Sequence, residues 1–94
     1  MAREKIGTVK DYNEESSGEE VIGEVTLELT GKLEKKDKIA LLGPVAYKPV
    51  EIKSIEKEGE KINEAEEGEI KIIVKSEEEI NARENTTVYK INWN

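Results

Sequence analysis

Apolar residues along this chain fall in short blocks of isoleucine, valine and leucine, separated by glycines and charge clusters. From Val21 to Thr30, the odd-numbered positions are apolar or glycine and most even-numbered positions are charged or hydroxylated. A period of two is typical of a β-strand with one buried face. The shorter block Lys38–Leu42 is apolar on both faces, as expected for a barrel wall that is also covered on its outside. Both blocks therefore predict strands.

The same pattern predicts strands elsewhere, with glycine-containing turns between them. Gly7 predicts a bend or a close backbone approach near the start of the first strand. Ile55 is out of phase with Val50 and Ile52, so we expect a bulge or a change of buried face near Ser54. In the last strand, the face that carries Tyr89 and Trp93 is expected to be buried. The further predicted strands are Lys5–Tyr12, Ala46–Lys57, Lys61–Asn63, Glu69–Lys75 and Thr86–Trp93.

Short strands at fairly even spacing, with no convincing amphipathic helix, predict an all-β fold. The expected architecture is a small closed antiparallel β-barrel of about six strands, which leaves no unpaired strand edges. We expect residues 1–94 to form one domain, with residues 1–4 as a polar lead-in and 13–20 as a flexible polar loop. Residues 64–68 are expected to form a turn, and Leu33 and Ile80 to anchor the charged connections.

Composition narrows the chemistry of the chain. The sequence has no cysteine and no histidine, so disulfides, thiolate metal sites and the commonest general base are absent. We therefore expect no catalytic residue, no metal site and no cofactor. Paired carboxylates are the remaining enzymatic hypothesis, although 22 acidic residues among 94 make chance pairs inevitable. The bias toward lysine, glutamate and isoleucine resembles that of proteins from hot environments.

The net charge of -7 bears on partners. A protein that follows a nucleic-acid backbone needs a basic face, so we expect no non-specific DNA or RNA binding, although a local basic strip stays open. No apolar run approaches the roughly 20 residues of a membrane span, and the N-terminus lacks the apolar core of a signal peptide. The sequence therefore predicts a cytoplasmic protein without a membrane partner.

Several segments resemble the second-domain β-barrel of translational GTPases such as elongation factor Tu. The likeness covers about residues 22–91. It is carried by Gly23-Glu-Val-Thr-Leu-Glu-Leu-Thr-Gly-Lys-Leu-Glu-Lys-Lys-Asp-Lys-Ile39, Val50-Glu-Ile-Lys-Ser-Ile-Glu-Lys57, Ile62-Asn-Glu-Ala-Glu-Glu-Gly-Glu-Ile70 and the closing Val88-Tyr-Lys-Ile91. The opening Ile6-Gly-Thr-Val-Lys-Asp-Tyr12 is similar to small stand-alone elongation-factor-like proteins of archaea, and also to the barrel at the C-terminus of U32-type peptidases.

This resemblance implies a non-catalytic binding module that contacts tRNA, the ribosome or a translation protein. The alternative that it implies is an accessory or protein-interaction barrel of the U32 type with no RNA role. The chain lacks a phosphate-binding Gly-rich loop of the GTPase type. Two positions depart from the family pattern. Lys36 replaces the turn glycine, so the turn either needs no positive φ or tolerates lysine at a cost, and Glu69 replaces an aspartate.

Seven residues form the candidate interaction surface. Four lysines surround the central turn, where they would bind a phosphate or an acidic partner, or simply keep the turn soluble beside Glu34 and Asp37. Two neighbours of Pro49 would offer a stacking surface for a base, or pack against the barrel mouth. The seven candidates are Lys32, Lys35, Lys36, Lys38, Tyr47, Lys48 and Lys53.

Overall fold

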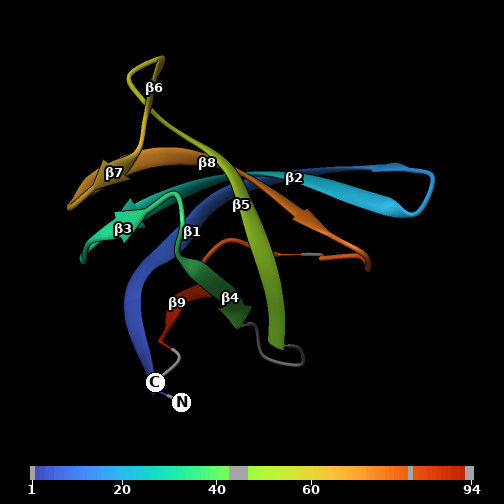
Figure 1. Cartoon of the computed structure of the whole chain (residues 1–94), viewed down its shortest axis with the longest axis horizontal. Coiled ribbons are helices and arrows are strands. Elements are labelled where there is room, and N and C mark those ends of the chain that lie inside the picture. The colour runs from blue at the N-terminus through green and yellow to red at the C-terminus, as the bar shows by residue number, and fades with distance from the viewer. Residues whose placement is uncertain (1, 43–46, 81, 93–94) are drawn as a thin grey trace.

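The computed structural model describes residues 2–42, 47–80 and 82–92, and it shows an all-β chain (Figure 1). Six strands form a closed antiparallel barrel in the order β4-β9-β1-β2-β8-β5, because β5 pairs back to β4. The predicted barrel is therefore confirmed. Its strands are β1 (Ala2–Ser17), β2 (Glu20–Leu29), β4 (Lys38–Leu42), β5 (Tyr47–Lys57), β8 (Gly68–Ser76) and β9 (Thr87–Asn92), and the shorter ones are β3 (Leu33–Glu34), β6 (Glu60–Ile62) and β7 (Glu64–Ala65).

The core is made of aliphatic side chains that point into the barrel from every strand of the wall. The alternation predicted for β2 is confirmed, since Val25 and Leu27 are fully buried and pair with Ile72 and Ile70 of β8. Full burial of one aliphatic side chain contributes about 1.5–3 kcal/mol. The remaining members of the core cluster are Ile6, Val9, Val21, Leu29, Leu33, Ile39, Leu41, Val50, Ile52, Ile55, Ala65, Val74, Ile80 and Val88.

The two predicted anchors lie under the connections. Leu33 is fully buried in β3, and Ile80 is 3% exposed in the segment that follows β8. The expected turn at residues 64–68 contains the two-residue strand β7, and Leu33 of β3 pairs there with Ala65. The core thus extends beneath both charged connections.

Bulges determine which faces of β1 and β5 point inward. The register of β1 shifts between Lys5 and Gly7 against β9, and between Val9 and Asp11 against β2. Each extra residue changes the phase of the alternation, which explains why neither face of this strand is continuously apolar in the sequence. The shift between Ile52 and Ser54 in β5 confirms the predicted bulge.

Two expectations at the N-terminal end are wrong. Residues 2–4 are part of β1 and pair with β9, so they are not a lead-in. Residues 13–17 continue β1 and pair with β2 around a turn at Gly18 (φ 65°), so 13–20 is a hairpin and not a loop. Backbone pairing to β2, which β8 supports from its other side, keeps this polar segment extended.

The face predicted to be buried in the last strand is right at Ile91, which is buried, and wrong at Tyr89. Val88 is fully buried, because it pairs with Gly7 on one side and Leu41 on the other, inside the barrel. Tyr89 lies on the opposite face and is partly exposed, with the guanidinium of Arg3 5.1 Å from its ring centroid. Trp93 lies outside the described residues.

The close backbone approach predicted at Gly7 is confirmed, and it gives a first test. A Cβ atom at this position would lie 2.6 Å from the carbonyl oxygen of Glu28 on β2. We expect Gly7→Ala to lower the free energy of unfolding by about 1–3 kcal/mol, because backbone must move to admit the methyl group. Urea unfolding measures this, with the exposed Lys10→Ala as control. A loss below about 0.5 kcal/mol for Gly7→Ala would contradict the close approach.

The hairpin that joins β5 to β6 gives a second test. Its two turn residues, Glu58 (φ 52°) and Gly59 (φ 84°), are both left-handed, as in a type I′ turn. Asparagine adopts this conformation more readily than glutamate. We expect Glu58→Asn to raise the free energy of unfolding by about 0.5–1 kcal/mol, whereas Glu60→Asn, which removes the same charge from β6, should not. If both variants changed the free energy of unfolding equally, the loss of a negative charge, and not the turn conformation, would explain the change.

Candidate functional site

The turn between β3 and β4 is held by the side chain of Asp37. Its Oδ2 accepts a hydrogen bond from the backbone N–H of Glu34 at 2.8 Å, and its own N–H donates to the Glu34 carbonyl at 3.0 Å. These two bonds place Lys35 and Lys36 at the tip of the turn. Lys36 is not among the described residues with positive φ, so this turn needs no glycine. Of the two alternatives stated for Lys36 in the sequence analysis, the one without positive φ is therefore right.

Lys90 of β9 connects this turn to the barrel wall. Its Nζ donates to the carbonyl oxygen of Lys32 at 2.9 Å and lies 3.8 Å from Asp37 Oδ2. The side chains of Lys90 and Asp37 are only 16% and 17% exposed, so salt screens this pair less than a pair on the open surface. The turn is therefore fixed to β9 as well as to β3.

Two adjoining hollows meet beneath the tip of the turn and share three lining residues, Lys35, Lys36 and Ile52. The smaller, of about 490 Å³, extends toward Asn63 and Glu64. The larger, of about 850 Å³, extends along the first part of β5 to the end of β8. We call the two together the turn groove. The aliphatic residues that line its larger part are Ile39, Val50, Ile52 and Ile91.

The charges along the larger part of the turn groove are balanced. Glu51 of β5 lies directly opposite Lys38 of β4 and Lys75 of β8, which makes a cross-strand row of alternating sign. A hydrogen bond and ion pair with Glu20, 2.8 Å away, raise the pKa of Lys75. The lining of the larger part of the turn groove holds four cationic and four acidic residues, namely Lys35, Lys36, Lys38 and Lys75 against Asp37, Glu51, Glu77 and Glu78.

The structure divides the seven residues predicted from the sequence. Lys35, Lys36 and Lys38 line the turn groove together. Lys32 is directed toward β7, where its Nζ lies 3.5 Å from Glu64 Oε2, and the charge of Glu64 raises its pKa.

The other three predicted residues lie away from these lysines or outside the described part of the chain. Lys53 is the extra residue of the β5 bulge. It lies near Glu20, whose pKa is lowered mainly by the Lys75 hydrogen bond and further by the charge of Lys53. The side chains of Tyr47 and Lys48 lie outside the part that the structure describes.

Three residues of this region were not predicted from the sequence. Lys90 looks in the sequence like an ordinary solvated position of the last strand, and Asn63 was placed at the end of the predicted strand Lys61–Asn63. Lys90 contacts Lys32 and Asp37, and the Asn63 carbonyl accepts the N–H of Lys35 at 2.8 Å. These contacts join positions far apart in the chain, so no local pattern marks them. Ile52 was expected in the wall, and its place in both hollows follows from the bulge beside it.

Within residues 2–42, 47–80 and 82–92, no group of three or more acidic residues is arranged to hold a metal ion. The described part of the chain also contains no helix long and apolar enough to cross a membrane.

By its architecture, this protein belongs to the class of small closed six-stranded β-barrels. It is similar to the crystal structure of the C-terminal domain of a Geobacillus thermoleovorans protein described as a U32 peptidase, with a TM-score of 0.68 and 21% sequence identity. The match covers 95% of this chain and 93% of that domain. At this identity the likeness establishes the fold. No protein-family model matches the sequence, and neither does any curated protein.

Asp37 offers a direct test of how the turn groove is built. Asp37→Ala removes the acceptor for Glu34 N–H and the partner of Lys90, whereas Asp37→Asn keeps an oxygen acceptor without the charge. We expect Asp37→Ala to lower the free energy of unfolding by about 1.5–3 kcal/mol and Asp37→Asn by less, measured by urea unfolding. Equal losses would mean that the charge pair, and not the turn hydrogen bond, stabilises this corner.

Proposed function

We propose that this chain is a non-catalytic accessory barrel that binds a protein partner through the turn groove. The observation that carries the proposal is the lining of the larger part of the groove, where aliphatic side chains lie between equal numbers of cationic and acidic groups. Such a surface matches a polypeptide, which also combines apolar groups with charges of both signs. The likeness to a domain of a larger protein supports an accessory role.

A role on RNA, as the resemblance to translation factors predicts, is less favoured by the charges. A nucleic-acid backbone is held by several cations directed to one side. Here Lys36 lies 3.6 Å from Glu34, and Lys32 lies 3.8 Å from Glu34 and 3.5 Å from Glu64. Acidic groups beside the cations would repel a polyanion, so the protein-binding alternative is the better supported of the two.

Titration of the protein with tRNA and with ribosomal subunits at low and high salt tests the RNA version. We expect no saturable binding at either salt concentration, because the lysines of the turn groove lie among carboxylates. Saturable binding at low salt that high salt removes would contradict the proposal and favour the translation-factor role.

Affinity capture from source cells tests the protein version. The bait is the intact chain, in parallel with the double variant Lys35→Glu, Lys36→Glu and with the control Lys61→Glu, which lies on exposed β6 outside the residues lining the groove. We expect the same stoichiometric protein with the wild type and the control, and at least about a tenfold loss with the double variant. Nuclease treatment should leave capture unchanged. Capture that depends on RNA, or that survives the double variant, would contradict this use of the groove.

A further inference from the structure

The hairpin of β1 and β2 projects beyond one end of the barrel (Figure 1). β1 pairs with β9 from Ala2 to Thr8, and the backbone of Val9 then bonds to Thr86 and Asn85. From Lys10 onward, β2 is the only strand of the described chain that pairs with β1. One side of residues 10–17 is therefore a strand edge at the rim of the sheet.

The register shows which backbone groups face this edge. The N–H of Tyr12 turns away from β2 and donates to Asp11 Oδ1 at 2.9 Å. The pairing with β2 runs without a shift from Asp11 to Ser17, and in antiparallel pairs alternate residues direct their backbone groups to the same side. The amide of Ser16, an exposed residue four positions after Tyr12, therefore faces the same edge.

The side chains behind this edge form an ordered support. The hydroxyl of Tyr12 donates to Glu14 Oε1 at 2.6 Å, and the N–H of Ile80 donates to the same oxygen at 3.3 Å. Gly23 leaves the space for the tyrosine ring, since a Cβ atom there would lie 2.9 Å from the hydroxyl oxygen. Burial and the neighbouring carboxylate raise the pKa of Tyr12, so it stays protonated as a donor. The edge thus belongs to a fixed strand.

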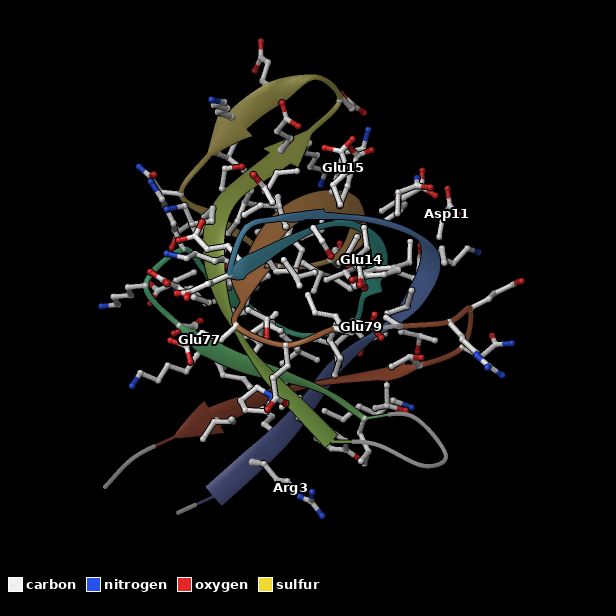
Figure 2. All side chains as sticks on the ribbon, turned by 90° about the vertical axis from the view of Figure 1, so that its right-hand side faces the viewer. Arg3, Asp11, Glu14, Glu15, Glu77 and Glu79 are labelled. Carbon is white, nitrogen blue, oxygen red and sulfur yellow. The ribbon has the colours of Figure 1, made fainter. Side chains whose placement is uncertain are left out.

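The charge around the edge is mostly negative, and Lys10 at its start is the one cation of residues 10–17. Residues 11–20 include five carboxylates and no lysine or arginine. Asp11 and Glu15 share the outer face of β1, while Tyr12 packs inward against the core. Figure 2 looks onto this end of the molecule. It shows Asp11, Glu14 and Glu15 of the hairpin together with Glu77 and Glu79 of the segment that follows β8.

We propose that residues 10–17 of β1 bind an extended basic segment of a partner protein as an added antiparallel strand. Backbone hydrogen bonds to an exposed strand edge are a general mode of peptide recognition. In the added strand, basic side chains on one face would meet Asp11 and Glu15, and aliphatic side chains on the other would extend the surface around Tyr12 and Ile80. A second copy of this chain is a poor occupant, because like charges would lie opposite each other.

The Asp11 hydrogen bond to Tyr12 N–H also protects the empty edge. An acidic edge with one capped amide pairs poorly with uncharged or acidic strands. The added strand would displace Asp11 from the amide and meet its carboxylate through a basic side chain. None of residues 10–17 is among the residues that line the turn groove, so variants at this edge test this inference without altering the groove lining.

The test uses a blocked peptide of about seven residues that alternates lysine and valine, with a glutamate and valine peptide of the same length as control. Binding to the full chain is followed by two-dimensional amide NMR. Ser16→Pro removes the edge-facing N–H, and Ser16→Ala retains it while also losing the hydroxyl. We expect the lysine peptide to bind wild type and Ser16→Ala equally, and Ser16→Pro at least about fivefold more weakly. Shifts should centre on residues 10–17.

A circular dichroism melt of both Ser16 variants verifies that each is folded. Equal binding to Ser16→Pro, shifts centred elsewhere, equal binding of the glutamate peptide or no binding of either peptide would each overturn the proposal. Self-association of the protein that Ser16→Pro abolishes would overturn the choice of occupant and show that the edge pairs with a second copy.

Discussion

Closure of the barrel depends on β4, a strand of five residues that pairs with β9 on one side and β5 on the other. Without this strand, β5 and β9 would each present an open edge to solvent. Closure places Ile39 and Leu41 inside, and it leaves Ala40 fully buried on the opposite face. With 35% apolar residues, the chain reaches a continuous core by enclosing it. The turn that precedes β4 therefore has two roles. It leads the chain into the strand that closes the barrel, and its residues Lys35 and Lys36 line the turn groove.

That double role explains why the turn is held so firmly. Asp37 bonds to the backbone of the turn, and Lys90 reaches it from β9, the neighbour of β4 in the barrel. A polar connection of this kind costs side-chain entropy, which the hydrogen bonds and the ion pair of Asp37 and Lys90 offset. Here the fixed position determines where β4 begins, and it also sets Lys35 and Lys36 over the groove.

Local rules were enough to predict the wall of the barrel and insufficient at its ends. The alternation of β2, the bulge near Ser54 and the close approach at Gly7 follow from side-chain period and backbone sterics, which a sequence displays directly. The β1–β2 hairpin was missed because its polar residues look like a loop, and only pairing with a supported neighbour makes them a strand. The same limit applies to the site, since Lys90 meets Asp37 through the closure of the barrel and no spacing in the sequence encodes it.

The net charge of -7 alone does not describe this molecule, because the balance of cations and carboxylates differs between the turn groove and the β1–β2 hairpin. Along the turn groove, cations and carboxylates alternate across β4, β5 and β8, so their fields largely cancel at a distance. At the β1–β2 hairpin, the carboxylates of residues 11–20 have no cation within their own segment, and the Lys75 hydrogen bond and the charges of Lys75 and Lys53 lower the pKa of Glu20. The carboxylates of residues 11–20 thus lie at the end where residues 10–17 form a strand edge. In the proposed strand addition, these carboxylates would repel polyanions and favour a basic polypeptide at that edge, so charge would select the partner.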